Sequence, residues 1–190
     1  MRQKILLAVV CLGILAVTAV LTGCLPGESP TPTIPADTPQ PARPPWQQIY
    51  TGISFYGPSL GLISGWHGTI LRSVDTGQNW TETKVPTAGD LNSIAILNAS
   101  TAIAVGSGGN ILRSTDSGQT WIKIESPTME TLNAVAAVSD GSAVAVGWHG
   151  TIIGTTDGGK TWTSRFNSQE PSVNFESVDL TKDGTRKCVS

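Results

Sequence analysis

The sequence has few of the residues on which metal and redox chemistry depends. Its 190 residues include three cysteines, two histidines and two tyrosines, and aromatic residues make up only 6%. Two histidines are too few to hold a metal ion by themselves, and no cluster of possible ligands has metal-site spacing. We therefore expect neither a metal nor a cofactor.

Charge is sparse as well. Charged residues make up 14% of the chain, and the net charge is −2. If Arg2 and Lys4 leave with an N-terminal leader, 10 basic residues remain against 14 acidic ones, a net charge of −4. Binding to phosphate backbones requires a basic excess, so this balance argues against nucleic acid as a partner.

The N-terminus has the pattern of a secretion signal. Arg2 and Lys4 precede an uncharged, mostly apolar run over 5–21, and the run ends in Leu21-Thr22-Gly23-Cys24. This ending resembles the lipobox of bacterial lipoproteins, whose cysteine is lipidated and becomes the new N-terminus. The resemblance implies a signal peptide over 1–23, acyl chains such as palmitate on Cys24, and an extracytoplasmic position on the cell membrane or outer membrane. A plain membrane-spanning anchor is the alternative, because a span needs about 20 apolar residues.

A proline-rich linker follows the lipidated cysteine and completes the segment 24–45. Eight prolines lie among residues 25–45, a composition that favours an extended spacer over a packed core. With Cys11 removed and Cys24 lipidated, only Cys188 remains, so the mature chain is expected to have no internal disulfide. Packing alone must then stabilise the folded part, which we place over 46–190.

An internal repeat of 41 residues dominates that folded part. Residues 65–80 read GWHGTILRSVDTGQNW, residues 106–121 read GSGGNILRSTDSGQTW and residues 147–162 read GWHGTIIGTTDGGKTW. In one unit, short apolar segments over 93–97, 101–105, 110–114 and 120–124 are separated by turn residues. Four short strands per repeat predict an all-β protein built of four-stranded antiparallel blades. Their apolar character on both faces indicates sheets packed between neighbouring blades.

Each repeat also contains the pattern S/T-x-D-x-G-x-x-W, at 73–80, 114–121 and 155–162. The pattern resembles the Asp-box, or bacterial neuraminidase repeat, of β-propellers. With the preceding G-x-x-G-x-I-L, the chain is most similar to the photosystem II stability and assembly factors. The resemblance implies a non-catalytic β-propeller-type scaffold that binds a protein partner.

The Asp-box residues have a structural explanation. The aspartate can accept hydrogen bonds from turn amides, the glycine permits a positive φ, and the tryptophan covers the turn. The residues assigned this structural role are Asp75, Gly77, Trp80, Asp116, Gly118, Trp121, Asp157, Gly159 and Trp162.

We find no pattern of catalytic residues and expect no enzyme. A sialidase needs converging arginines and a tyrosine nucleophile, whereas Arg72 and Arg113 hold equivalent repeat positions and both tyrosines lie near the domain start. A surface carbohydrate-binding or glycoside hydrolase-type protein remains the alternative function, with Trp66 and Trp148 as sugar platforms.

Two sets of residues are candidates for partner binding. Arg72 and Arg113 offer forked donors that suit a partner carboxylate, although the third repeat has Gly154 there. The second set repeats Trp-His-Gly-Thr at the turn after the second strand, and its members are Trp66, His67, Trp148 and His149. Exposed or locally paired arginines and a turn with a packed tryptophan are the structural alternatives.

The repeats do not complete a propeller. A partial fourth repeat occupies 173–190, with Asn174 aligned to Asn92 and Asn133. In that alignment Arg186, Lys187 and Cys188 replace two apolar strand residues and a glycine, which suggests a truncated or frameshifted gene product. Residues 46–50 resemble a fourth strand that closes a ring. About three and a half blades leave an open propeller whose apolar end faces favour self-association.

Overall fold

The computed structural model describes residues 48–166, 173–180 and 186–189. They belong to one compact unit, Ala42–Ser190. The predicted leader, Cys24 and linker lie outside the described residues. Within the described part, no helix has the length and apolarity needed to cross a membrane.

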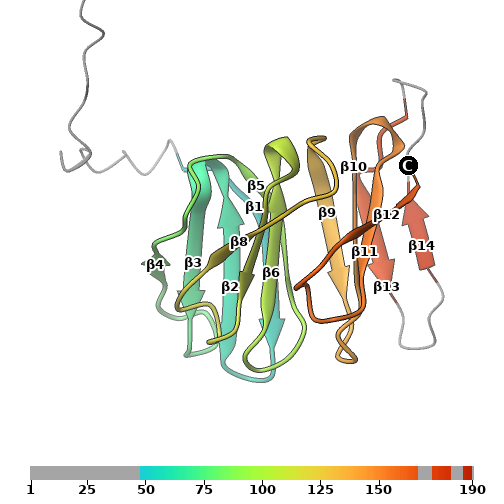
Figure 1. The fold of residues 1–190 in the computed structure, drawn as a ribbon. Coiled ribbons are helices and arrows are strands. Elements are labelled where there is room, and N and C mark those ends of the chain that lie inside the picture. Colours follow the sequence, from blue (N-terminus) through green and yellow to red (C-terminus); the bar gives the residue numbers. More distant parts are fainter. Residues whose placement is uncertain (1–47, 167–172, 181–185, 190) are drawn as a thin grey trace, which may run out of the picture. The chain divides into compact units, whose positions relative to one another are not determined.

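Three four-stranded antiparallel sheets follow one another along the chain, and each has its strands in sequence order (Figure 1). We call them blades 1 to 3. Blade 1 contains β1 (Tyr50–Tyr56), β2 (Leu60–Gly65), β3 (Thr69–Ser73) and β4 (Thr81–Thr83). Blade 2 contains β5 (Leu91–Ile96), β6 (Ala102–Gly106), β7 (Ile111–Ser114) and β8 (Ile122–Ile124). Blade 3 contains β9 (Leu132–Ala137), β10 (Ala143–Gly147), β11 (Ile152–Thr155) and β12 (Thr163–Phe166).

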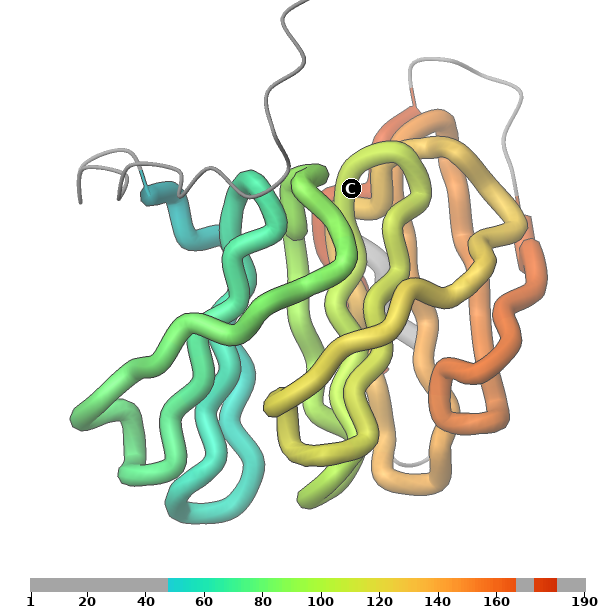
Figure 2. The backbone as a smooth tube through the Cα atoms, turned by 60° about the vertical axis from the view of Figure 1, so that its left-hand side comes forward, coloured from blue at the N-terminus to red at the C-terminus, as the bar shows by residue number. Residues whose placement is uncertain are grey.

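This architecture confirms the predicted all-β class and the four strands per repeat. The third strand of each blade is followed by the S/T-x-D-x-G-x-x-W segment, which connects it to the fourth. A short 3-10 turn joins the second and third strands, over Trp66–Gly68, Ser107–Gly109 and Trp148–Gly150. The backbone trace shows the blades side by side (Figure 2). In the described residues, no strand from one end of the array joins a sheet at the other end, so the propeller is open.

A fourth blade begins with two strands, β13 (Ser177–Leu180) and β14 (Arg186–Val189). Ser177 pairs with Val189, as Ala134 pairs with Val146 in blade 3. The fourth repeat is therefore displaced by two residues from the alignment in which Asn174 matched Asn133. Arg186 stands at the place of Ala143, and β14 forms where the sequence pattern was expected to fail.

The start of the described chain also differs from the expectation. Residues 46–50 were expected to form a fourth strand, but Tyr50 begins β1, the first strand of blade 1. The carbonyl of Ile49 accepts a hydrogen bond from the Trp66 amide, as Asp90 and Thr131 do from Ser107 and Trp148. Ile49 thus matches residues that precede the first strands of blades 2 and 3, so the described part of this segment, 48–50, is not a fourth strand.

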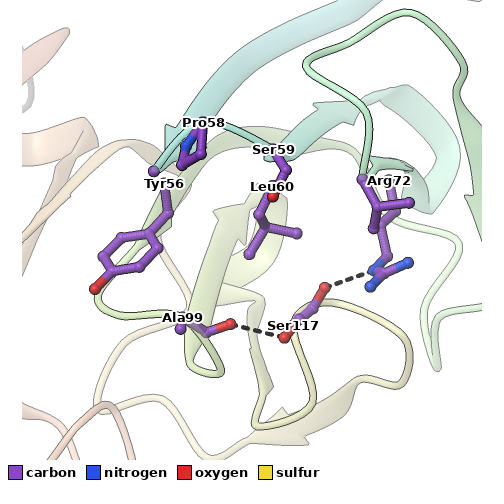
Figure 3. A pocket seen from close by; sticks show the side chains of 9 residues that line it. Tyr56, Pro58, Ser59, Leu60, Arg72, Ala99 and Ser117 are labelled. Carbon is purple, nitrogen blue, oxygen red and sulfur yellow. Dashed lines mark hydrogen bonds between the residues drawn. The ribbon is translucent and has the colours of Figure 1, made fainter.

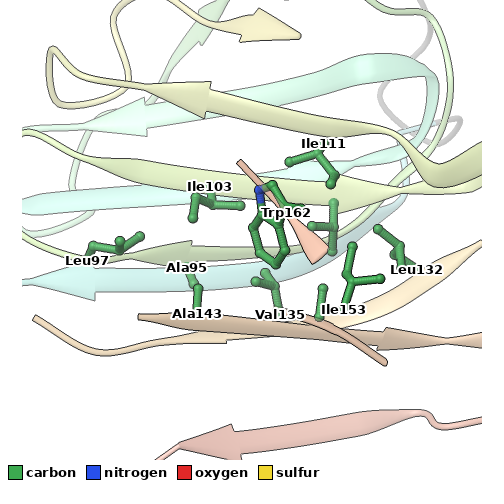
Figure 4. Packing of buried hydrophobic residues seen from close by; sticks show 11 residues of the cluster. Ala95, Leu97, Ile103, Ile111, Leu132, Val135, Ala143, Ile153 and Trp162 are labelled. Carbon is green, nitrogen blue, oxygen red and sulfur yellow. The ribbon is translucent and has the colours of Figure 1, made fainter. Parts of the chain in front are cut away.

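Two hydrophobic clusters lie between successive blades. The first joins blades 1 and 2 through residues such as Leu62, Ile94 and Trp121. The second joins blades 2 and 3 through residues such as Ile103, Val135 and Trp162 (Figure 4). All five residues of β6 and of β10 are buried. This is the physical reason for strands that are apolar on both faces, because each inner sheet is covered on both sides.

Candidate functional site

Arg72 and Arg113 each extend from the third strand of one blade to the motif turn of the next. We use "motif turns" for residues 73–80, 114–121 and 155–162. Arg72 Nε donates to the Ser117 carbonyl at 2.7 Å, and Arg113 Nε donates to the Gly158 carbonyl at 2.6 Å. Both side chains are half-buried. The guanidinium has five N–H groups, so these bonds between blades use one and leave the others available for a ligand.

Blade 3 supplies its arginine from another strand. The equivalent of Arg72 and Arg113 is Gly154, and Arg165 of β12 lies over it. A Cβ built on Gly154 would be 3.1 Å from Arg165 Nε. Ile152 pairs with Phe166 and Ile153 with Ser164, so Arg165 is the extra residue of a β-bulge. Bulges reorient side chains. This bulge brings a third arginine to the place of Gly154, where the other two repeats have an arginine of their own. Sequence reasoning missed it because nothing in the residue pattern marks the bulge.

A pocket of about 320 Å³ adjoins Arg72 at the junction of blades 1 and 2 (Figure 3). Tyr56, Pro58 and Leu60 of blade 1 provide its apolar wall, and Ser117 belongs to the motif turn of blade 2. Ser117 Oγ donates to the Ala99 carbonyl at 2.7 Å, which fixes this turn against its own blade. The pocket combines an aromatic ring, aliphatic carbon and a cation, which suits a carboxylate carried on an apolar group.

The aspartates of the motif turns point their carboxylates at the backbone of their own turns. Asp116 Oδ1 accepts from the amides of Gln119 and Thr120, at 3.0 and 2.9 Å, and Asp116 Oδ2 accepts from the Thr120 hydroxyl. Asp157 makes the same set with the amides of Lys160 and Thr161.

These hydrogen bonds favour the ionised carboxylate. The amide and side chain of Asn79 are the main causes that hold the pKa of Asp75 at about 2. Burial opposes the effect at Asp116, but the hydrogen bonds from Thr120, Ser114 and Gln119 still lower its pKa. The hydroxyl and amide of Thr161 lower the pKa of Asp157 far below the ordinary value. A general acid needs a raised pKa, so these carboxylates are suited to holding turns and not to proton donation at neutral pH.

The tryptophans close the motif turns, and Trp121 and Trp162 also pack between blades. Trp80 Nε1 donates to the Gly77 carbonyl and Trp121 Nε1 to the Gly118 carbonyl. Trp162 is buried like Trp121, but its Nε1 has no partner among the described residues. Gly77, Gly118 and Gly159 have φ near +80°. The motif turns are thus local structural units, and those of blades 2 and 3 present backbone carbonyls to the arginines of the preceding blade.

The two Trp-His-Gly turns lie at the other end of the strands from the arginines. Trp66 and Trp148 are 40% and 47% exposed. His67 and His149 have φ of 59° and 52°, in the left-handed region that Gly108 occupies in blade 2. Residues other than glycine rarely adopt this region, and contacts with the adjacent blade hold the two histidines in this conformation.

One hydrogen bond to a side chain of a neighbouring loop holds the backbone of each histidine. The His67 amide donates to Asp90 Oδ1 at 2.9 Å, and the His149 amide donates to Asn174 Oδ1 at 3.1 Å. His149 Nδ1 also lies 2.8 Å from Glu130 Oε2. The histidines are therefore positioned by neighbouring loops, each with its ring partly exposed.

The structure separates the two sets of candidate residues. Strand β3 begins beside the Trp66 turn and ends beside Arg72 and the motif turn, so the sets lie at opposite ends of the blades. We call the arginine end the "Arg rim", defined by Arg72, Arg113 and Arg165, and the other end the "Trp rim", defined by Trp66, His67, Trp148 and His149. The described residues contain no group of three His, Cys, Asp or Glu that could hold a metal ion.

The repeated blades, their shared cores and the arginine contacts between them define a β-propeller-type repeat domain. The chain belongs to the DUF6242 β-propeller domain family, whose model matches residues 62–187. No curated protein matches the sequence.

Solved structures extend the comparison. A structure of YCF48 bound to D1 peptide is similar at 26% identity and TM-score 0.61, over 75% of this chain and 48% of that one. YCF48 from Cyanidioschyzon merolae is 22% identical, with TM-score 0.60, over 75% and 50%. An ancestral GH74 enzyme is 13% identical, with TM-score 0.58, over 72% and 22%, and this likeness concerns the fold alone. The chain spans about half the length of the YCF48 structures. The likeness to YCF48 agrees with the assembly-factor resemblance of the sequence.

Proposed function

We propose that this protein is a lipid-anchored, non-catalytic scaffold that binds a protein partner at the Arg rim. The observation that carries the proposal is the position of Arg72, which bonds to the next blade and lines a pocket with an aromatic and aliphatic wall. Arg165 adds a more exposed cation at the equivalent place in blade 3. The ligand that suits this site is a polypeptide that presents carboxylates beside apolar side chains.

The similarity to YCF48 supports a polypeptide as the ligand class. One YCF48 structure contains a bound D1 peptide, and it is 26% identical to this chain over the aligned part. The motif-turn aspartates support the non-catalytic part, because their carboxylates accept hydrogen bonds from amides of their own turns and their lowered pKa values disfavour proton donation. The lipid anchor rests on the sequence around Cys24.

Affinity capture from the organism's own membranes tests the proposal. Arg165→Gln removes the cation without removing a hydrogen bond between described blades, so the fold should persist while capture of the partner falls several-fold. Lys123→Gln, which removes an exposed strand cation of blade 2, is the matched control. If both variants capture the same polypeptides as the wild type, the binding site is not the Arg rim.

A carbohydrate-binding or glycoside hydrolase-type function is the second candidate, supported by the exposed indoles of Trp66 and Trp148. Aromatic side chains of this kind can stack on sugar rings, and both occupy the Trp rim. Binding of polysaccharides that is lost in Trp66→Ala and Trp148→Ala, with unchanged partner capture, would favour this function over the first.

A further inference from the structure

The first strand of blade 1 lies uncovered where the same strands of blades 2 and 3 are covered. We call the face of a blade that meets the preceding blade its "leading face". On the leading faces of blades 2 and 3, Ile94 and Val135 are 5% and 7% exposed. Ile53, at the same repeat position in blade 1, is 59% exposed. Among the described residues, nothing packs on blade 1 as blade 1 packs on blade 2.

The uncovered face is apolar from its inner to its outer strand. Phe55 packs edge-on against Trp80, with ring centroids 6.1 Å apart at 70°. Gly61 permits this contact, since a Cβ there would lie 2.6 Å from the Phe55 ring. The residues that match buried or half-buried leading-face positions of blade 2 are Tyr50, Ile53, Phe55, Ile63, Leu71 and Trp80, all of them uncharged and at least partly exposed.

The composition of this face differs from that of a blade interior. Tyr50 replaces the leucines Leu91 and Leu132, and Phe55 replaces Ile96 and Ala137. Aromatic side chains at exposed positions, with few charges, are typical of protein–protein interfaces.

The exposed side of β13, at the other end of the array, is not complementary to the apolar leading face of blade 1. On β13 and the residue before it, Glu176, Ser177 and Asp179 are exposed. Packing the apolar face of blade 1 against these carboxylates would desolvate them without a partner, which is unfavourable. A head-to-tail contact between copies is therefore disfavoured, whereas the same face of a second copy is complementary.

We propose that the leading face of blade 1 is a dimer interface, in which it packs against the same face of a second copy across a two-fold axis. A two-fold interface of this kind is the commonest form of homo-oligomer, and it leaves two Arg rims available. The proposal does not depend on the function of those rims.

Cysteine cross-linking in native membranes tests the symmetry directly. In the full chain with Cys188→Ser, Ile53→Cys should give a covalent dimer upon mild oxidation, because equivalent positions near a two-fold axis approach each other. Ile122→Cys, at a residue 56% exposed on the edge strand β8, is the control in the same background and should give little dimer. Equal yields from both variants, a species larger than the dimer, or adducts of Ile53→Cys with another polypeptide would overturn the proposal.

A mass measurement on the purified full chain provides the second test. The wild type should show a concentration-dependent dimer, and Ile53→Asp should shift the dissociation constant at least tenfold toward monomer while circular dichroism stays the same. A wild type that remains monomeric over the whole concentration range would also overturn the proposal, with the N-terminal part of the same chain as the alternative cover of this face.

Discussion

Arg165 lies across the backbone of Gly154, so blade 3 has a cation at the position that Arg72 and Arg113 occupy in blades 1 and 2. The repeat sequence has no arginine at that position, and a bulge in β12 supplies one. Two arginines join neighbouring blades and a third lies at the equivalent place, so an arginine recurs at the Arg rim in each of the three blades.

The arginines should separate into two functional kinds. Arg113→Gln removes the hydrogen bond to the Gly158 carbonyl and should lower the free energy of unfolding by about 1–3 kcal/mol. Arg165→Gln should leave stability within about 0.5 kcal/mol, as is usual at an exposed position. Chemical denaturation of both variants measures the difference. Equal destabilisation by both substitutions would show that Arg165 also joins blades.

The motif turns should act through stability. Asp116→Ala leaves the amides of Gln119 and Thr120 without their acceptor and should cost about 1–3 kcal/mol. Trp121→Ala removes a buried indole from the cluster between blades 1 and 2 and should cost about 3–5 kcal/mol. Thermal unfolding checks both values. An Asp116→Ala protein with wild-type stability and no partner binding would contradict the structural role.

Acid should weaken the same turns. The pKa of Asp75 is about 2 in the folded protein, and those of Asp116 and Asp157 are also lowered from the model-compound value of 3.8. A folded-state pKa below the unfolded one contributes stability above about pH 4, and this contribution is lost as the pH falls toward 2. The unfolding temperature should therefore change little from pH 7 to 5 and fall between pH 4 and 2. A variant with all three aspartates changed to asparagine should show a smaller fall, and an unchanged acid profile would assign acid sensitivity to other carboxylates.

Close backbone contacts at the Trp rim end of the blades should make two adjacent glycines behave differently. A Cβ on Gly109 would lie 2.1 Å from the Thr128 carbonyl oxygen, whereas a Cβ on Gly108 would meet no atom within 4 Å. Both have positive φ. Gly109→Ala should thus prevent folding or strongly destabilise it, while Gly108→Ala should cost about 1 kcal/mol from the left-handed backbone alone. Expression level and denaturation midpoint distinguish the two outcomes, and equal effects would contradict the packing of this turn.

Cys24 is expected to carry the lipid. Cys24→Ala should leave the precursor unprocessed or release the domain from membranes, and globomycin should cause the wild-type precursor to accumulate. Fractionation followed by immunoblotting measures both effects. A Cys24→Ala protein that is processed and sediments with membranes like the wild type would refute the anchor.

The sequence was sufficient for the repeat, the four strands of each blade and the position of the motif turns, because these depend on local apolar patterns and on glycine and proline punctuation. The Trp-His turns could also be placed at one end of the blades from the same pattern. Two features required the structure. The bulge at Arg165 depends on pairing with β11, and the two-residue displacement of the fourth repeat depends on the register between β13 and β14. Neither the bulge nor the displacement can be predicted from the residue types.

Site-specific photo-cross-linking in living cells determines whether a partner polypeptide binds at the Arg rim. A photoreactive phenylalanine analogue at Val74, which is 57% exposed and lines the Arg72 pocket, should form an adduct with one partner polypeptide. The same analogue at Trp148, on the Trp rim, should form none with that partner. The adduct from Val74 should disappear when Arg72 and Arg165 are both changed to glutamine. Adducts from Trp148 alone would place the binding site at the Trp rim instead of the Arg rim.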